Sequence, residues 1–184
     1  MIEIRIHGRG GQGSVIASKI MAVAMFSEGK WVQSFPKFGV ERRGAPVEAF
    51  LRLAEDKILI RSEIDTPDHI IILDPTLVEA TDVTSGLKKG GWIVINTPGQ
   101  PEDFPEFKDY KLGCVNANQI AITHRLGPKS APIVNTAICG AFAGATGLVG
   151  IDAVCDAILV EAPIKAEANA QAARDAFNAI TLKD

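Results

Sequence analysis

The fold is decided by residues 2–17, which read Ile2-Glu-Ile-Arg-Ile-His-Gly-Arg-Gly-Gly-Gln-Gly-Ser-Val-Ile-Ala17. The first six of these residues alternate apolar and polar side chains, a pattern that predicts a β-strand, and the glycines end it where an apolar, helix-forming segment to Glu28 begins. We therefore expect a strand, a glycine turn and a helix. Such a turn leaves the first N–H groups of the helix unpaired, and glycines let a ligand or a partner's backbone approach closely. An anion is the ligand that this arrangement favours.

The glycines at positions 8, 10 and 13 also satisfy the G-x-G-x-x-G pattern of dinucleotide sites. Such a site needs an acidic residue near the end of the second strand, roughly 20 residues beyond the glycines, to hold the ribose. The expected second strand, residues 31–35, runs instead into Pro36 and Lys37, and Glu28 precedes it. The turn also lacks Gly-Lys-Ser/Thr, which excludes a P-loop. A nicotinamide or flavin dinucleotide is thus the least favoured occupant, a purely structural tight turn comes next, and another ligand at the helix N-terminus is favoured.

The second informative stretch is residues 36–46, Pro-Lys-Phe-Gly-Val-Glu-Arg-Arg-Gly-Ala-Pro. Its prolines and glycines predict a loop, and Glu41, Arg42 and Arg43 stand side by side in it. One interpretation is a solvated turn with local pairing of glutamate and arginine. The other follows from position, because in a doubly wound sheet this loop leaves the same edge as the glycine turn. Arginine suits phosphate or carboxylate, so the pair is predicted to clamp an anion presented to that turn.

Composition limits the function classes. With 184 residues, 47% of them hydrophobic, the chain can bury one good core, and we expect a single domain over residues 1–184. The formal net charge is −3 and no block of like charges stands out, so neither nucleic acid nor an anionic membrane surface is an expected partner. No basic region precedes an apolar run, and no apolar segment approaches about 20 residues. These features predict a cytoplasmic protein.

The three cysteines, Cys114, Cys139 and Cys155, are far apart in the sequence. They form no C-x-x-C pair, and no histidine stands at ligand spacing, so neither an iron–sulfur nor a zinc signature is present. We predict that they are buried free thiols and that the chain has no metal site.

The other strands follow from apolar runs. Residues 47–53 alternate apolar and polar side chains and are separated by a short acidic turn from residues 57–60, which predicts an antiparallel hairpin inserted at the edge of the sheet. Residues 68–73 and 92–95 are continuous apolar runs, as expected of parallel strands covered on both faces. Residues 111–115 are predicted to be the last strand. His69, near the start of a strand, is expected to be a packed or surface histidine rather than a catalytic one.

The second half of the chain is predicted to be largely helical. Asn116 is expected to cap a helix over residues 117–126, and another helix begins at Asn135. That helix carries glycines at 140, 144 and 147; because glycine in a helix costs up to about 1 kcal/mol relative to alanine, we expect another backbone close by, either within the fold or from a partner chain. Helical stripes over residues 151–159 and 166–180 complete an α/β domain with a mainly parallel sheet.

Together, the glycine turn at residues 8–13 and the segment 34–46 resemble the gamma subunit of pyruvate:ferredoxin oxidoreductase and of related 2-oxoacid:acceptor oxidoreductases. The resemblance covers essentially the full length, and two motifs at the right separation make it specific. The run Glu-Arg-Arg-Gly-Ala-Pro at residues 41–46 favours the pyruvate-type branch over the indolepyruvate branch. Val40 departs from the family pattern, in which proline is more common at this position.

The resemblance implies a Rossmann-like three-layer domain with a mainly parallel sheet and an antiparallel hairpin at its edge. It implies a complex that converts a 2-oxoacid and coenzyme A to an acyl-CoA and CO2 and passes electrons to ferredoxin. Thiamine diphosphate, Mg2+ and [4Fe-4S] clusters are expected on the other subunits, with none bound by this chain alone. The implied partners are the alpha, beta and ferredoxin-like delta subunits, coenzyme A, and ferredoxin as acceptor. The gamma chain is expected to pack against the thiamine-bearing subunits and to help admit or bind coenzyme A.

No residue of this chain is predicted to be catalytic, and the isolated chain is predicted to be inactive. Two alternatives stay open, a stand-alone dinucleotide-binding protein and a purely architectural subunit. The residues expected to bind a coenzyme A phosphate, or to form the edge of the active site, come from the two motifs: Gly8, Arg9, Gly10, Gly11, Gln12, Gly13, Ser14, Glu41, Arg42 and Arg43.

Overall fold

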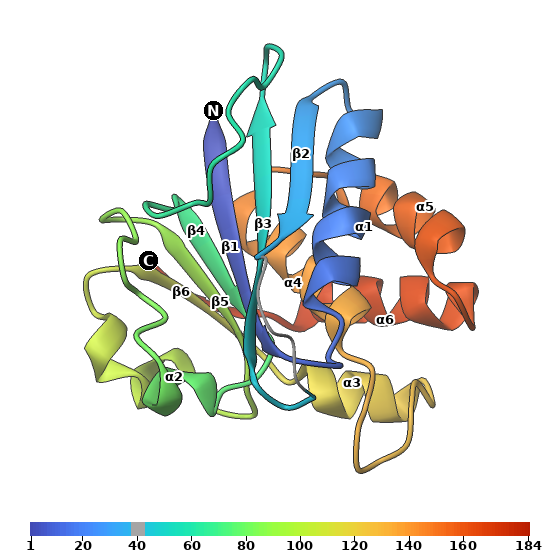
Figure 1. Ribbon diagram of the computed structural model, residues 1–184. Coiled ribbons are helices and arrows are strands. Elements are labelled where there is room, and N and C mark those ends of the chain that lie inside the picture. Colours follow the sequence, from blue (N-terminus) through green and yellow to red (C-terminus); the bar gives the residue numbers. More distant parts are fainter. Residues whose placement is uncertain (38–42) are drawn as a thin grey trace.

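The computed structural model describes residues 1–37 and 43–184, and within them one mixed sheet forms the centre of the molecule (Figure 1). The order of its strands is β2-β3-β1-β4-β5-β6-β7. Their bounds are β1 Ile2–Arg9, β2 Trp31–Pro36, β3 Pro46–Ala54, β4 His69–Ile72, β5 Trp92–Asn96, β6 Lys111–Val115 and β7 Thr181–Lys183.

The α-helices gather mainly on one face of this sheet, where α1, α4, α5 and α6 pack together (Figure 1). The other face is covered by α2, two short 3-10 helices and irregular segments. The bounds are α1 Ser14–Ser27, α2 Leu77–Ala80, α3 Ala117–Thr123, α4 Asn135–Thr146, α5 Ile151–Glu161 and α6 Ala166–Ala179, with 3-10 helices at Pro101–Asp103 and Pro105–Phe107.

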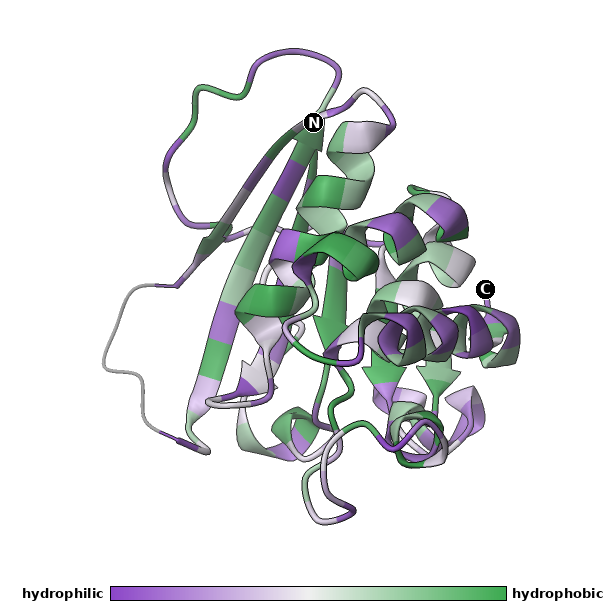
Figure 2. Cartoon of the chain, turned by 90° about the vertical axis from the view of Figure 1, so that its right-hand side faces the viewer, coloured by the Kyte–Doolittle hydropathy of each residue, from purple (hydrophilic) through white to green (hydrophobic). Residues whose placement is uncertain are grey.

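Strand direction divides the sheet into two parts. Strands β1, β4, β5 and β6 are parallel, whereas β3 runs antiparallel to both β1 and β2, and β7 runs antiparallel to β6. Strands β4 and β5 are short apolar runs with residues buried on both faces, such as Ile71 against the helices and Ile70 against the other layer. Figure 2 shows this part of the sheet coloured largely as hydrophobic. The predicted α/β class, with a mainly parallel sheet and an antiparallel hairpin at its edge, is confirmed.

The predicted partners within that hairpin were wrong. Residues 57–60 form no strand, and β3 pairs instead with β2, in a register that runs from Trp31 opposite Ala54 to Pro36 opposite Ala49. Leu59 is 79% exposed and Ile60 46%, so this apolar run has no buried face to hold it in a sheet. The edge strand is therefore β2, and β3 lies between it and β1. Residues 111–115 are likewise not the last strand, because β7 adds to β6 from the C-terminal end.

The glycines of α4 allow close packing within the chain. A Cβ atom on Gly140 would overlap the carbonyl group of Ala173 on α6, and one on Gly144 would lie 2.9 Å from the carbonyl oxygen of Phe177. The predicted close approach of another backbone is confirmed, and that backbone is α6 of the same chain. Gly147 has a different role, because it ends α4 at φ 63° in the left-handed region that favours glycine.

Helix α1 is covered by the sheet on one side and by α5 on another, as its nearly all-apolar sequence predicts. A third side is open, and Val15, Ile16 and Phe26 are 42%, 38% and 65% exposed there. Within the described ranges, no helix combines the length and the apolar character needed to cross a membrane.

Candidate ligand site

The glycine turn connects β1 to α1 as predicted. Gly11 and Gly13 have φ angles of 95° and 83°, values at which glycine is strongly preferred, and Gly13 is the N-cap of the helix. Among the described residues, no side chain caps this helix by a hydrogen bond, and its first turn holds no acidic residue. The N-terminus of α1 therefore offers N–H groups and the positive end of the helix dipole to a ligand.

The segment that enters β3 lies beside this turn. Because β1 and β2 are both antiparallel to β3, they run in the same direction, and the connection from β2 leaves the edge from which the glycine turn projects. The N–H of Gly10 donates to the carbonyl of Ala45 at 2.9 Å, and the N–H of Gly44 donates to the carbonyl of Gly10 at 3.0 Å. The expected juxtaposition of the two motifs is confirmed for the residues from Arg43 onward.

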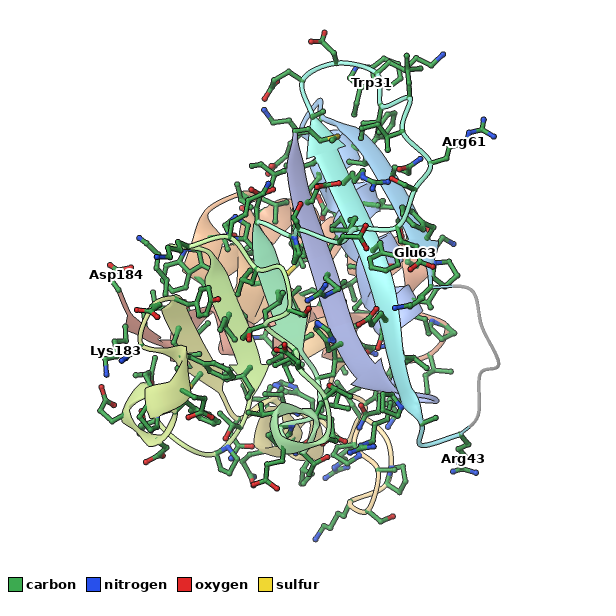
Figure 3. All side chains as sticks on the ribbon, turned by 60° about the vertical axis from the view of Figure 1, so that its left-hand side comes forward. Trp31, Arg43, Arg61, Glu63, Lys183 and Asp184 are labelled. Carbon is green, nitrogen blue, oxygen red and sulfur yellow. The ribbon has the colours of Figure 1, made fainter. Side chains whose placement is uncertain are left out.

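Arg43 is exposed and projects from the sheet at the end opposite Trp31 (Figure 3). A backbone bridge joins Arg43 to Gly10, so its main chain is held next to the turn. Glu41 and Arg42 lie outside the described residues, and the predicted clamp by both arginines stays a prediction.

A cavity of about 640 Å³ opens at the carboxyl ends of β1, β4 and β5. It lies at the point where the chain order reverses, with β3 and β2 on one side of β1 and β4 to β6 on the other, and this is where open α/β sheets bind ligands. Its volume is within the range of pockets for small molecules and cofactors. The lining comes from residues 11–13 and Ile16, residues 73–76, Asn96, Asn118, residues 130–136, residues 162–164 and Asn169.

Two helices begin at this cavity. The first turn of α1 lines it, and so do the residues at which α4 starts, Val134, Asn135 and Thr136. In the part of the chain that the structure describes, α4 also lacks a side-chain cap and an acidic residue in its first turn. Of the described residues that line the cavity, Asp74 is the only ionisable one. Two helix dipoles thus direct positive potential into a space with a single carboxylate, which favours an anionic or neutral polar group.

Asn135 has an unsatisfied side-chain atom at this point. Its side chain packs against Gly13, it is 5% exposed, and its Oδ1 has no hydrogen-bond partner within the described structure. The Oγ of Ser14, 3% exposed and packed against Gly8, also lacks a partner there. A buried polar atom without a partner costs about 1–3 kcal/mol, so such atoms are uncommon unless a ligand or water satisfies them. Sequence reasoning identified Asn135 only as a helix start and missed it as a site residue.

Asp74 organises the rim of the cavity. Its carboxylate accepts hydrogen bonds from Gln12 Nε2 at 2.8 Å and from Thr76 Oγ1 at 2.6 Å, and Arg9 Nε lies 3.3 Å away. Burial acts to raise the pKa of Asp74, but the hydrogen bonds from Thr76 and Gln12 and the charge of Arg9 outweigh it and lower that pKa. The group is therefore ionised at neutral pH. Asp74 directly follows the apolar run at residues 68–73, and it was not predicted to be a site residue.

The histidines of the first half of the chain lie away from the cavity lining. His69 Nδ1 accepts the backbone N–H of Trp92 at 3.0 Å, which confirms a packed histidine. His7 is buried on the sheet face away from α1, where Arg5 Nε lies 3.0 Å from its Nε2 and Glu48 lies 3.6 Å from its Nδ1. Burial, together with the charge of Arg5, lowers the pKa of His7 to about 4.

The cysteines do not fit an iron–sulfur cluster. Cys114 lies in β6, Cys139 in α4 and Cys155 in α5, and all three are buried free thiols, as predicted. Burial raises the pKa of Cys114 and of Cys139 to about 12. Within residues 1–37 and 43–184, no group of three or more histidine, cysteine or acidic side chains is placed to hold a metal ion.

Comparison with known proteins then decides the family. The sequence model described as pyruvate ferredoxin/flavodoxin oxidoreductase matches residues 3–179. The chain belongs to this family. The resemblance inferred from the two motifs is thereby confirmed, and the matched range covers both motifs and, apart from Ile2, every element from β1 to α6.

Relatives within the family are named gamma or PorC subunits. The chain is 51% identical to the pyruvate/ketoisovalerate oxidoreductases common subunit gamma of Thermococcus kodakarensis, over 97% of this chain and 96% of the relative. It is 50% identical to pyruvate synthase subunit PorC of Methanocaldococcus jannaschii, over 100% and 99% of the two chains. The crystal structure of pyruvate oxidoreductase subunit PORC from Thermotoga maritima superimposes with a TM-score of 0.84 at 31% identity, covering 100% of this chain and 98% of that one.

The topology of this oxidoreductase chain also disfavours a dinucleotide. In a dinucleotide-binding domain the ribose is held by an acid at the end of the second strand, which lies next to the first. Here β3 separates β2 from β1, so the end of β2 lies two strands away from the glycine turn. The residue there is Lys37, whose Nζ pairs with Glu48 at 2.9 Å. Neither the position nor the charge suits a ribose.

Proposed function

We propose that this chain is the gamma subunit of a heteromeric oxidoreductase that converts pyruvate and coenzyme A to acetyl-CoA and CO2 and reduces ferredoxin. The names of the relatives support this assignment, since they are the gamma subunit common to pyruvate/ketoisovalerate oxidoreductases, a pyruvate synthase subunit PorC and a pyruvate oxidoreductase subunit PORC, and they match over nearly their full length. Thiamine diphosphate, Mg2+ and the [4Fe-4S] clusters would be held by the alpha, beta and delta subunits. Three separate, buried cysteines are consistent with that division.

Within the complex, we propose that this chain holds coenzyme A. The observation that carries the proposal is the cavity of about 640 Å³, which is lined by Asn135 and by the starts of α1 and α4, neither of which has a side-chain cap among the described residues. Coenzyme A carries both anionic groups and hydrogen-bond donors. Its phosphates suit helix N–H donors, and its hydroxyl, amide and adenine amino groups can donate to Asn135.

Both sequence motifs would contribute hydrogen bonds to the phosphate groups of coenzyme A. The N–H groups of Arg9, Gly10 and Gln12 are engaged within the chain, so the backbone donors for phosphate would be those at the start of α1. Arg43 is held beside Gly10 with an exposed guanidinium. Arginine binds phosphate by paired, charge-assisted hydrogen bonds. Glu41 and Arg42 belong to the same proposed edge of the active site on the strength of the sequence motif.

The test is steady-state kinetics on the purified complex, with assembly checked by size exclusion. Arg43→Ala should raise the KM for coenzyme A about ten- to a hundredfold, the loss expected for one charge-assisted hydrogen bond of about 1.5–3 kcal/mol. The KM for pyruvate should not change, and Arg43→Lys should restore the affinity only partly. Asn135→Ala should also raise the KM for coenzyme A.

The matched control is Arg174→Ala. Arg174 is a half-exposed arginine on α6 that pairs with Asp152, away from the cavity lining. Its replacement should leave the KM for coenzyme A unchanged. Intact complexes in which neither Arg43→Ala nor Asn135→Ala alters that constant would remove coenzyme A from this site and leave an architectural subunit.

A further inference from the structure

We infer that Asp74 is a positioning residue: it braces the glycine turn against β4, with Arg9 and Gln12 as its partners, and so fixes the N–H groups that receive the ligand. This inference rests on the proposed coenzyme A site. It assigns to Arg9 a role within the brace.

The position of Asp74 suits a brace. It follows β4, the parallel neighbour of β1, and its side chain is 16% exposed. One carboxylate oxygen accepts the N–H of Thr76 at 3.0 Å and the hydroxyl of Thr76 at 2.6 Å, while the other accepts Gln12 Nε2 at 2.8 Å. The first oxygen thus anchors the carboxylate to its own strand end, and the second reaches across to the turn.

Gln12 links the carboxylate of Asp74 to the main chain of the turn. Its Nε2 donates to Asp74, and its Oε1 accepts the backbone N–H of Arg9 at 2.8 Å. The N–H of Gln12 also donates to the carbonyl of Arg9 at 2.9 Å. One amide side chain therefore ties together the end of β1, the turn and the end of β4, and the carboxylate determines which way that amide faces.

Arg9 connects the second motif to the residues that follow β4. Its Nη2 donates to Thr76 Oγ1 at 2.7 Å and its Nη1 donates to the carbonyl of Gly44 at 3.1 Å, while its Nε lies beside Asp74. Gly44 directly follows Arg43. Because these interactions engage all three guanidinium nitrogens within the chain, Arg9 connects β4 to the segment that enters β3.

The variant Asp74→Asn tests the brace. It removes the charge opposite Arg9 and turns an amide N–H or a weaker acceptor toward Gln12 Nε2, so the amide of Gln12 is no longer held. In the assembled complex, the KM for coenzyme A should rise about tenfold, as for the loss of one hydrogen bond to a charged group, while kcat and the KM for pyruvate stay unchanged. Gln12→Ala should have a similar effect, and the two changes should be non-additive in a double-mutant cycle.

A rescue variant separates positioning from general damage. In Asp74→Asn combined with Gln12→Glu, the new glutamate can accept both the side-chain N–H of residue 74 and the backbone N–H of Arg9, so most of the lost affinity should return. The matched control is Asp152→Asn, which removes the carboxylate of an exposed pair with Arg174 and should alter neither KM. If Asp74→Asn does not assemble, Gln12→Ala takes its place and should raise the KM for coenzyme A with no change in kcat or in the KM for pyruvate.

The outcomes distinguish this inference from the proposed function. An unchanged KM for coenzyme A in Asp74→Asn, while Arg43→Ala raises it, overturns the brace and leaves the coenzyme A site standing. The brace is also overturned if Asp74→Asn lowers kcat and raises both KM values by similar factors and Gln12→Glu does not restore them. If none of the variants changes the KM for coenzyme A, the proposed coenzyme A site is wrong. The brace is then tested by amide hydrogen exchange at the backbone N–H of Arg9. Faster exchange there in Asp74→Asn supports the brace, and unchanged exchange refutes it.

Discussion

Replacing Gly140 with alanine tests how closely the helical layer is packed. Gly140 lies in the middle of α4 and is fully buried, and a Cβ atom there would overlap the carbonyl group of Ala173 on α6. The obstacle is backbone, and no side-chain rotation can relieve it. The two helices would have to separate, and α6 also packs against α5, so the change would propagate through the layer.

The magnitude follows from two opposing terms. Alanine in place of a helical glycine gains about 1 kcal/mol of helix propensity. Overpacking a close-packed core costs about 1–3 kcal/mol, and a contact with backbone belongs at or above the upper end of that range. We expect a net loss of about 2 kcal/mol in the free energy of unfolding, which for a domain of this size lowers the Tm by about 4–8 °C.

The assay is thermal and urea unfolding of the full chain followed by circular dichroism. Gly144→Ala provides the graded comparison, since its Cβ would lie 2.9 Å from the carbonyl oxygen of Phe177 and 3.3 Å from a side-chain atom of Ile180, and it should lose less stability than Gly140→Ala. If Gly140→Ala unfolds at or above the Tm of the unmodified chain, the packing argument for these glycines is refuted.

Two further predictions concern buried titratable groups. The pKa of His7 is lowered from its usual 6.5 to about 4, so the folded state resists protonation that the unfolded state accepts, and stability should fall by up to about 3 kcal/mol as the pH drops from 6.5 towards 4. His7→Gln should flatten the unfolding free energy between pH 6.5 and 5, and an unchanged slope would contradict the assignment. Because Cys114, Cys139 and Cys155 are buried, with pKa values raised, none should react with a thiol reagent at pH 8 until denaturant is added; rapid labelling of the native chain would show that a thiol is accessible.

The local elements of the fold were predictable because their causes are local. The strand, turn and helix over residues 2–17 follow from alternation and from glycines, of which Gly11 and Gly13 adopt positive φ angles. Asn116 caps α3 as expected, accepting the N–H of Gln119 at 3.0 Å. Strands β4 and β5 were recognised from continuous apolar runs, since burial on both faces removes the alternation.

Pairing was not predictable in the same way. Residues 57–60 are as apolar as a strand, and a short turn joins them to β3, yet β3 pairs with β2 across the longer connection through residues 36–46. Which strand completes a hairpin depends on the surface that the rest of the molecule offers. Here α1 lies against β2 and β3 and covers β2 in part, whereas Leu59 and Ile60 stay exposed.

The sequence by itself determined the family, the order of most elements and the two motifs of the candidate site. Each of these depends on residues that are contiguous in the sequence, and their conformation and chemistry do not require distant partners. Tertiary structure alone decided that Asn135 lies against Gly13, that Asp74 reaches Gln12, and that Arg9 is engaged within the chain. These relations join segments far apart in the sequence at one edge of the sheet. They depend on strand order and helix packing, which a local pattern does not encode, because a side chain meets distant partners only once the core has placed their strands and helices side by side.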